Sequence, residues 1–124
     1  MSVKPLVVPL IAVAVVAGAG WYVLRPKTET LGRYDAGVET VNIGELDQAD
    51  VGQRIAIKGK IVEECPHSGC WAVIEDGTGR IRIDTNKGGF ALPLRREGST
   101  IRIVGEIEQT DGGSLLLSAE GAQL

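Results

Sequence analysis

Isoleucine alternates with charged residues in three separate segments of this chain. These isoleucines are Ile55, Ile57, Ile61, Ile81, Ile83, Ile101, Ile103 and Ile107. Because successive side chains of a strand point to opposite faces, a period of two predicts strands with one buried and one solvated face. We therefore expect all these isoleucines to share one core, and no other feature constrains the fold as strongly.

Two further segments complete the predicted set of five strands. Residues 71–74 form a short apolar run, and Leu115 and Leu117 begin the last strand. Glycine-rich turns are predicted at residues 77–79 and at residues 111–113, the second as a hairpin turn. The connection between the third and fourth strands is irregular in sequence, so we expect no strand there.

Glycine occupies inward positions within two of the predicted strands, at Gly59 and Gly105. Interior glycine often marks a bulge or a sharp bend where a sheet closes on itself. Five strands with one irregular connection predict an all-β, OB-fold-like barrel over residues 42–124. Residues 50–62 and 97–107 resemble the opening and fourth strands of many OB-fold domains. A flat antiparallel sheet with one solvated face is the alternative.

Residues 5–24 contain no charged side chain and are mostly apolar. A helix of this length spans about 30 Å, the hydrocarbon thickness of a bilayer. Trp21 and Tyr22 stand at its far end, where amphipathic rings favour the interface, and two basic residues follow at once. This pattern predicts one N-terminal transmembrane helix, an anchor that follows a short tail, residues 1–4.

Two other interpretations of this segment stay open. Ala17, Gly18 and Ala19 form the small-x-small triplet that signal peptidase requires, so residues 1–19 are a candidate for cleavage. A buried core helix is the third interpretation. The apolar run continues beyond the triplet to Leu24, which favours retention of the anchor.

Residues 25–41 are polar and lack an apolar period, which predicts a juxtamembrane linker. The Lys and Arg count on the two sides of the anchor slightly favours a cytoplasmic domain. The two cysteines favour the opposite side, because disulfides persist in oxidising compartments. We expect a single-pass protein of the inner (cytoplasmic) membrane, with its C-terminal domain on the periplasmic side.

The charge balance argues against a nucleic-acid partner. Residues 1–27 hold three basic and no acidic residues, which leaves ten basic and sixteen acidic residues in the rest of the chain. Binding to a phosphate backbone needs a basic stripe. We therefore expect Arg80 and Arg82, which share one strand face, and the pair Arg95 and Arg96 to be solvated rather than to follow a nucleic acid.

The segment from Cys65 to Trp71 holds both cysteines and the only histidine of the chain, His67. Cys65 ends one predicted strand and Cys70 begins the next, so the two cysteines lie near the base of a hairpin. Opposed positions there have Cβ atoms about 4.5–5.5 Å apart, and modest adjustment brings two sulfurs into bonding range. We expect Trp71 in the barrel core or at its mouth.

Three interpretations of this segment compete. The first is a disulfide between Cys65 and Cys70, or two inert thiols, that shapes the loop. The second is a soft-metal site of Cys65, His67 and Cys70, suited to Cu(I) or Zn(II). The third is thiol–disulfide exchange, with His67 supplying positive charge.

The segment resembles the Cys-x4-Cys-Trp signature of small exported bacterial OB-fold proteins, matched here by Cys65, Gly69, Cys70 and Trp71. The resemblance implies location and fold and brings no established activity. The overall plan of span, linker and exported barrel is similar to the OB-fold haem chaperone of cytochrome c maturation. That family attaches haem through a His/Tyr motif near the barrel end, and residues 118–124 contain neither residue type.

These observations favour a non-enzymatic, membrane-anchored envelope accessory protein, a metal or redox-assembly helper that uses Cys65 and Cys70. The alternative is an interaction module that docks into a larger membrane complex, with its cysteines in a structural disulfide. The expected partners are the membrane itself and another membrane or periplasmic protein. Because His67 is the only histidine, no Ser/His/Asp catalytic set can be assembled.

Overall fold

The computed structural model describes residues 28–124. The tail (1–4), the anchor (5–24), the cleavage triplet (17–19) and the first residues of the predicted linker lie outside the described residues. Within residues 28–124, no helix is both long enough and apolar enough to cross a membrane.

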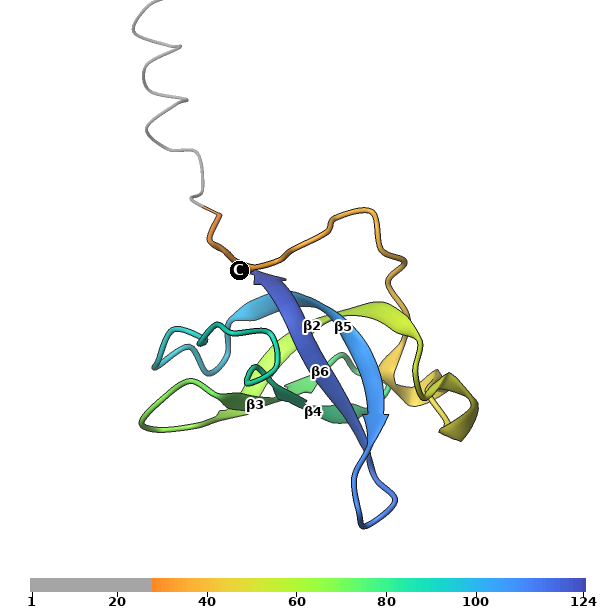
Figure 1. The fold of residues 1–124 in the computed structure, drawn as a ribbon. Helices are drawn as coiled ribbons and strands as arrows, with labels where there is room; N and C mark the ends of the chain where they lie inside the picture. Colours follow the sequence, from red (N-terminus) through yellow and green to blue (C-terminus); the bar gives the residue numbers. More distant parts are fainter. Residues whose placement is uncertain (1–27) are drawn as a thin grey trace, which may run out of the picture.

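The described chain is all-β, with six strands and two short 3₁₀ helices (Figure 1). The strands are β1 (Thr30–Gly32), β2 (Arg54–Glu64), β3 (Trp71–Glu75), β4 (Arg80–Asp84), β5 (Thr100–Gln109) and β6 (Leu115–Gln123). The 3₁₀ helices are η1 (Ile43–Glu45) and η2 (Gln48–Asp50). The five predicted strands correspond to β2–β6, so this part of the prediction is confirmed.

Strand β2 closes the sheet into a barrel because it pairs with two neighbours. Its first part, Arg54–Lys60, pairs antiparallel with β5, and its last part, Lys60–Glu64, pairs antiparallel with β3. Strand β5 pairs with β6, and β6 pairs in parallel with β4 over Leu116–Ser118. Figure 1 shows β5 and β6 crossing over β3 and β4. This closure excludes the flat sheet and fits an OB-fold.

The predicted isoleucines form the core. Ile57, Ile103 and Ile107 have no exposed surface, and the other five of the set are at most 6 % exposed. Leu117 is also fully buried, and Leu115 packs against this cluster while partly exposed. Each such side chain contributes roughly 1.5–3 kcal/mol on leaving water. The single core predicted from the alternation is confirmed.

The two interior glycines lie where backbones approach closely. A Cβ on Gly105 would come 2.1 Å from the Ser118 carbonyl oxygen, and the β5–β6 register shifts at this residue. A Cβ on Gly59 would come 2.3 Å from the Glu75 carbonyl oxygen. Both glycines therefore permit the close strand crossing that the predicted closure requires.

The end of the predicted linker packs on the barrel instead of extending freely. Residues Thr30–Gly32 form β1, which pairs antiparallel with the end of β6. The Arg102 guanidinium donates to the Tyr34 hydroxyl (2.9 Å) and lies 5.6 Å from the centre of the Tyr34 ring. Backbone pairing, this arginine contact and the packing of Leu31 against the core hold the segment in place, although its sequence shows no apolar period.

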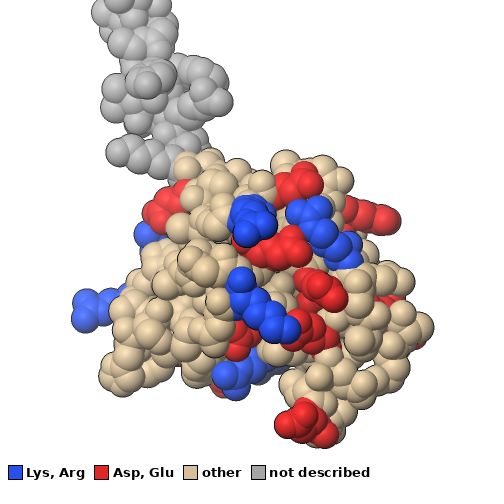
Figure 2. All heavy atoms as spheres, in the orientation of Figure 1, with Lys and Arg blue, Asp and Glu red and all other residues tan. Residues whose placement is uncertain are grey.

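Both signs of charge are interspersed on the face seen in Figure 2. Arg54 forms ion pairs with Asp35 and Glu120, and Arg80 forms one with Glu75. Arg80, Arg82 and Arg95 are exposed as expected, while Arg96 is half-buried.

Candidate functional site

The cysteines lie at the two ends of the loop that joins β2 to β3. The Cys65 N–H donates to the Trp71 carbonyl (3.1 Å), which closes the hairpin and brings the two side chains to the same end of the barrel. Cys65 is 7 % exposed and Cys70 is half-buried. The two Sγ atoms are 3.7 Å apart.

The Cys65–Cys70 disulfide is not formed in this structure. Both cysteines are free, and their 3.7 Å separation exceeds the roughly 2.05 Å of a disulfide bond. The two cysteines do lie close together at the base of the hairpin, as expected, but both are thiols and no bond joins them. A third side chain is in contact with both sulfurs.

Ser68 is that side chain, and it was not singled out from the sequence. Its Oγ lies 3.2 Å from the Cys65 Sγ and 3.1 Å from the Cys70 Sγ, and the Cys70 thiol donates toward Cys65. The sequence feature that could have identified Ser68 is its position as a hydroxyl residue in a short loop flanked by two cysteines. Three polar side chains thus form one connected cluster.

This cluster lowers the pKa of the Cys65 thiol to about 6. The Ser68 hydroxyl has the largest effect, followed by the backbone N–H groups of His67 and Ser68, and the Cys70 thiol adds a smaller one. Burial acts in the opposite direction, because it disfavours the charged thiolate. Near neutral pH, Cys65 is therefore mainly a thiolate, the nucleophilic form.

The structure does not group His67 with the two cysteines. Among residues 28–124, no three His, Cys, Asp or Glu side chains are close enough to hold one metal ion. The structure therefore does not bring Cys65, His67 and Cys70 together, and their binding of Cu(I) or Zn stays a prediction. His67 is exposed, and its contact with Cys65 is made through the backbone N–H. The His67 imidazole is not among the groups that lower the pKa of the Cys65 thiol.

The loop is held from behind by the long connection between β4 and β5. The Leu92 N–H donates to the Gly69 carbonyl (2.8 Å), and the Thr85 N–H donates to the Cys70 carbonyl (3.0 Å). Gly69 has φ +61, and a Cβ there would come 2.1 Å from the Leu92 carbonyl oxygen. Glycine at this position is thus required twice, by its backbone conformation and by the close contact.

Trp71 faces outward and is not in the core, which was one of its two expected positions. The next residue in the strand, Ala72, is fully buried, so alternation places Trp71 on the outer face. The Arg82 guanidinium lies 4.8 Å from the centre of the Trp71 ring, a cation–π contact. The indole is half-buried under this arginine.

A groove of about 550 Å³ runs beside Cys65. It is lined by Glu64, Cys65, Pro66, Leu94, Arg95 and Glu97. The Glu64 carboxylate accepts the backbone N–H groups of Arg96 (2.8 Å) and Glu97 (3.3 Å), which fixes the far wall. The groove therefore brings solvent to one of the two cysteines.

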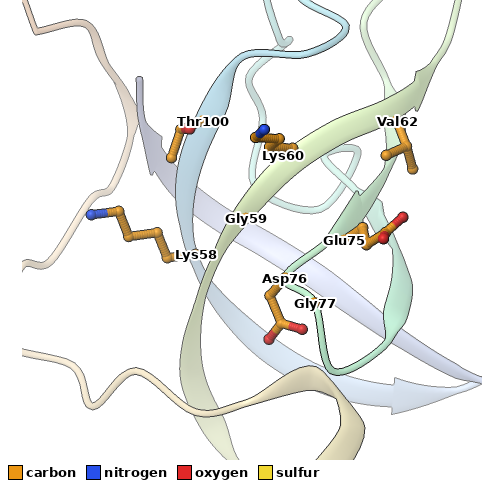
Figure 3. A pocket seen from close by; sticks show the side chains of 8 residues that line it. All are labelled: Lys58, Gly59, Lys60, Val62, Glu75, Asp76, Gly77 and Thr100. Carbon is orange, nitrogen blue, oxygen red and sulfur yellow. The ribbon is translucent and has the colours of Figure 1, made fainter.

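A second hollow of about 570 Å³ lies over β2, β3 and the turn after β3 (Figure 3). Lys58 and Glu75 point away from each other in this view. Asp76 is engaged locally, since its carboxylate accepts the N–H groups of Ile43 and Thr78 (both 2.8 Å). This hollow contains no thiol or histidine, so the cysteine loop remains the candidate site.

No protein-family model and no curated protein matches the sequence. Among solved structures, the chain is similar to a proposed aspartyl-tRNA synthetase from Leishmania major Friedlin (TM-score 0.50, 12% identity, 72% of this chain). The match covers 21% of the synthetase, so this chain spans about a fifth of its length. The hypothetical protein ygiW from E. coli also matches (TM-score 0.46, 22% identity, 72% of this chain and 94% of that one). At such identities, the likeness to the synthetase concerns the fold alone.

Replacing Gly69 by alanine tests the close contact with Leu92. We expect Gly69→Ala to lower the free energy of unfolding by about 3 kcal/mol or more, because it combines left-handed strain with loss of the Leu92 hydrogen bond. Gly77→Ala is the matched control, since Gly77 has φ +89 and nothing within 4 Å of an added Cβ. The control should cost only about 1–2 kcal/mol. Urea unfolding that gives equal losses would contradict the contact.

Alkylation of Cys65 tests its low pKa. In Cys70→Ser, the rate of reaction with iodoacetamide should rise with pH and reach half its maximum near pH 6. Adding Ser68→Ala should move that midpoint toward the ordinary, higher value of a thiol. Because the folded pKa lies below the unfolded one, the thiolate stabilises the fold at alkaline pH, and this contribution disappears as pH falls through about 6. A midpoint at the ordinary thiol pKa in both variants would refute the assignment.

Proposed function

We propose that this protein is a membrane-anchored envelope accessory protein whose Cys65 and Cys70 form a redox couple that donates its disulfide to a dithiol in a partner protein. The observation that carries the proposal is two free thiols 3.7 Å apart, both in contact with Ser68. A small movement of the loop joins the sulfurs. Each oxidised molecule donates one disulfide to its partner. In this way the protein would help the partner to assemble.

The exposure of the two cysteines supports distinct roles for them. Cys70 is the more accessible sulfur, whereas Cys65 is 7 % exposed. A partner thiolate therefore attacks Cys70 in the disulfide form, and the Cys65 sulfur leaves. The leaving group with the lower pKa departs faster, and the environment of Cys65 stabilises its thiolate.

The exchange balances in two steps. In the first, a partner thiolate forms a bond to the Cys70 Sγ as the Cys65–Cys70 bond breaks, and Cys65 departs as a thiolate. In the second, the other partner thiolate attacks the partner sulfur of this mixed disulfide and expels Cys70, which takes up a proton. The partner dithiol is oxidised by two electrons, and the Cys65–Cys70 pair is reduced by two.

The favoured direction follows from which state the loop stabilises. Ser68 contacts both sulfurs, and the hydrogen bonds to the Cys65 thiolate exist only after reduction. Interactions confined to the reduced form raise the reduction potential of a couple. The disulfide form is consequently an oxidant rather than an inert structural bridge.

The envelope location rests on the sequence of residues 5–24. An uncharged run of bilayer length, followed at once by Arg25 and Lys27, supports a retained anchor. A disulfide donor has its use in an oxidising compartment. The proposal therefore places residues 42–124 on the periplasmic side.

Equilibration of the full chain in glutathione buffers tests the redox couple. We expect a Cys65–Cys70 disulfide with a reduction potential less negative than about −300 mV. Structural disulfides typically have potentials below this value. Ser68→Ala should make the potential more negative, because the reduced form loses a donor, whereas the exposed Ser114→Ala should leave it unchanged. The fraction oxidised is measured by alkylation and mass spectrometry.

Two results would overturn the redox proposal. One is a potential at or below about −300 mV, which marks a structural bridge. The other is failure of oxidised glutathione to close the disulfide at all. Either result would favour the interaction module, in which the barrel surface rather than the thiols is used.

Labelling of intact spheroplasts tests the location. A maleimide that cannot cross the inner membrane should modify the cysteines after mild reduction, and Cys65→Ser with Cys70→Ser should remove the signal. The variant with both substitutions is the negative control, because the sequence contains no other cysteine. Labelling only after the membrane is opened would place the domain in the cytoplasm.

A further inference from the structure

We propose that the loop forms its own disulfide by reducing hydrogen peroxide, with Cys65 as the residue that attacks the peroxide and Cys70 as the residue that resolves the product. This inference rests on the redox couple of the proposed function and names the oxidant that charges it. The site would then consume one small peroxide molecule for each disulfide it makes.

The cluster of hydrogen-bonding groups around Cys65 suits this reaction. A thiolate attacks peroxide faster than a thiol does, and Ser68 together with the Cys70 thiol stabilises the anion at Cys65. The same groups can donate to the oxygen that leaves. Hydrogen-bond donors aimed at developing charge accelerate such steps.

The resolving step is favoured by proximity. The Cys70 Sγ is 3.7 Å from the Cys65 Sγ, and both cysteines belong to one short loop held by hydrogen bonds from Leu92 and Thr85. A low-pKa cysteine with a resolving thiol beside it is the arrangement expected of a cysteine that is oxidised reversibly. Close approach of the second thiol prevents further oxidation of the first.

Access to Cys65 selects for a small oxidant. Cys65 is 7 % exposed and is reached along the groove whose opposite wall contains Leu94 and Arg95. Hydrogen peroxide fits this approach, whereas a protein disulfide would need a more open sulfur. Cys70, the more accessible of the two cysteines, remains for the partner protein. The two cysteines therefore meet different reactants.

The chemistry balances as follows. The Cys65 thiolate attacks one oxygen of hydrogen peroxide; an S–O bond forms, the O–O bond breaks, and the leaving hydroxide takes up a proton to become water. The Cys70 sulfur then attacks the sulfenic sulfur of Cys65, so that an S–S bond forms and the S–O bond breaks. The hydroxide released from the sulfenic acid takes up the proton of Cys70 and leaves as water. The dithiol loses two electrons, and one peroxide becomes two waters.

The test follows peroxide, thiols and adducts in the reduced full chain. With limiting hydrogen peroxide, we expect two thiols lost per peroxide, and a rate at least about tenfold above that of free cysteine at equal thiolate concentration. Cys70→Ser should stop at the sulfenic acid, trapped by dimedone on Cys65. Cys65→Ser should react no faster than free cysteine.

Serine variants separate positioning from mere folding. Ser68→Ala should slow the reaction roughly tenfold to a hundredfold while the purified chain keeps the circular dichroism spectrum of the barrel. Ser114→Ala, in the exposed β5–β6 turn, should react like the unsubstituted chain. A Ser68→Ala rate equal to that of Ser114→Ala would remove Ser68 from the mechanism and, with it, the proposed activation of Cys65.

The outcomes distinguish this inference from the proposed function. A chain that reacts with peroxide no faster than free cysteine, yet forms its disulfide with oxidised glutathione, overturns peroxide reduction and leaves disulfide donation standing. A chain that neither oxidant converts to the disulfide overturns both. Dimedone adducts that accumulate in the unsubstituted chain would show that Cys70 does not resolve, which also overturns the inference.

Discussion

Closure of the barrel depends on the division of β2 between two partners. Lys60 pairs with Thr100 on β5 and with Glu75 on β3, so one strand belongs to both halves of the barrel. Such a change of partner needs a close crossing, which Gly59 allows because any Cβ there would strike the Glu75 carbonyl. The same strand ends at Glu64 and passes directly into the cysteine loop. The position of the candidate site is therefore set by the closure of the barrel.

The spacing of the two thiols depends on contacts made far along the chain. The Gly69 and Cys70 carbonyls accept hydrogen bonds from Leu92 and Thr85, which belong to the irregular β4–β5 connection. Leu92 is buried in the core, so the anchor moves only if the core does. A short loop that would otherwise sample many conformations thus keeps both sulfurs within reach of Ser68.

The strands and core were predictable because alternation of isoleucine with charge is local information. The loop geometry was not, because it depends on long-range contacts that no local pattern encodes. Trp71 was expected in the barrel core or at its mouth, but its ring lies on the outer face against Arg82 of the neighbouring strand. His67 attracted attention as a side chain, while its backbone N–H has the chemical effect. Ser68 is common in loops, and only the structure shows it in contact with both sulfurs.

The stabilisation of the Cys65 thiolate has opposing effects on its chemistry. A lower pKa raises the fraction of thiolate at neutral pH but lowers the intrinsic nucleophilicity of each thiolate. It also makes Cys65 a better leaving group once a disulfide has formed. As the attacking atom, Cys65 gains in thiolate fraction and loses in nucleophilicity, whereas as the departing atom in exchange it only gains. Its burial matches both uses, because a large partner needs contact only with the more exposed Cys70.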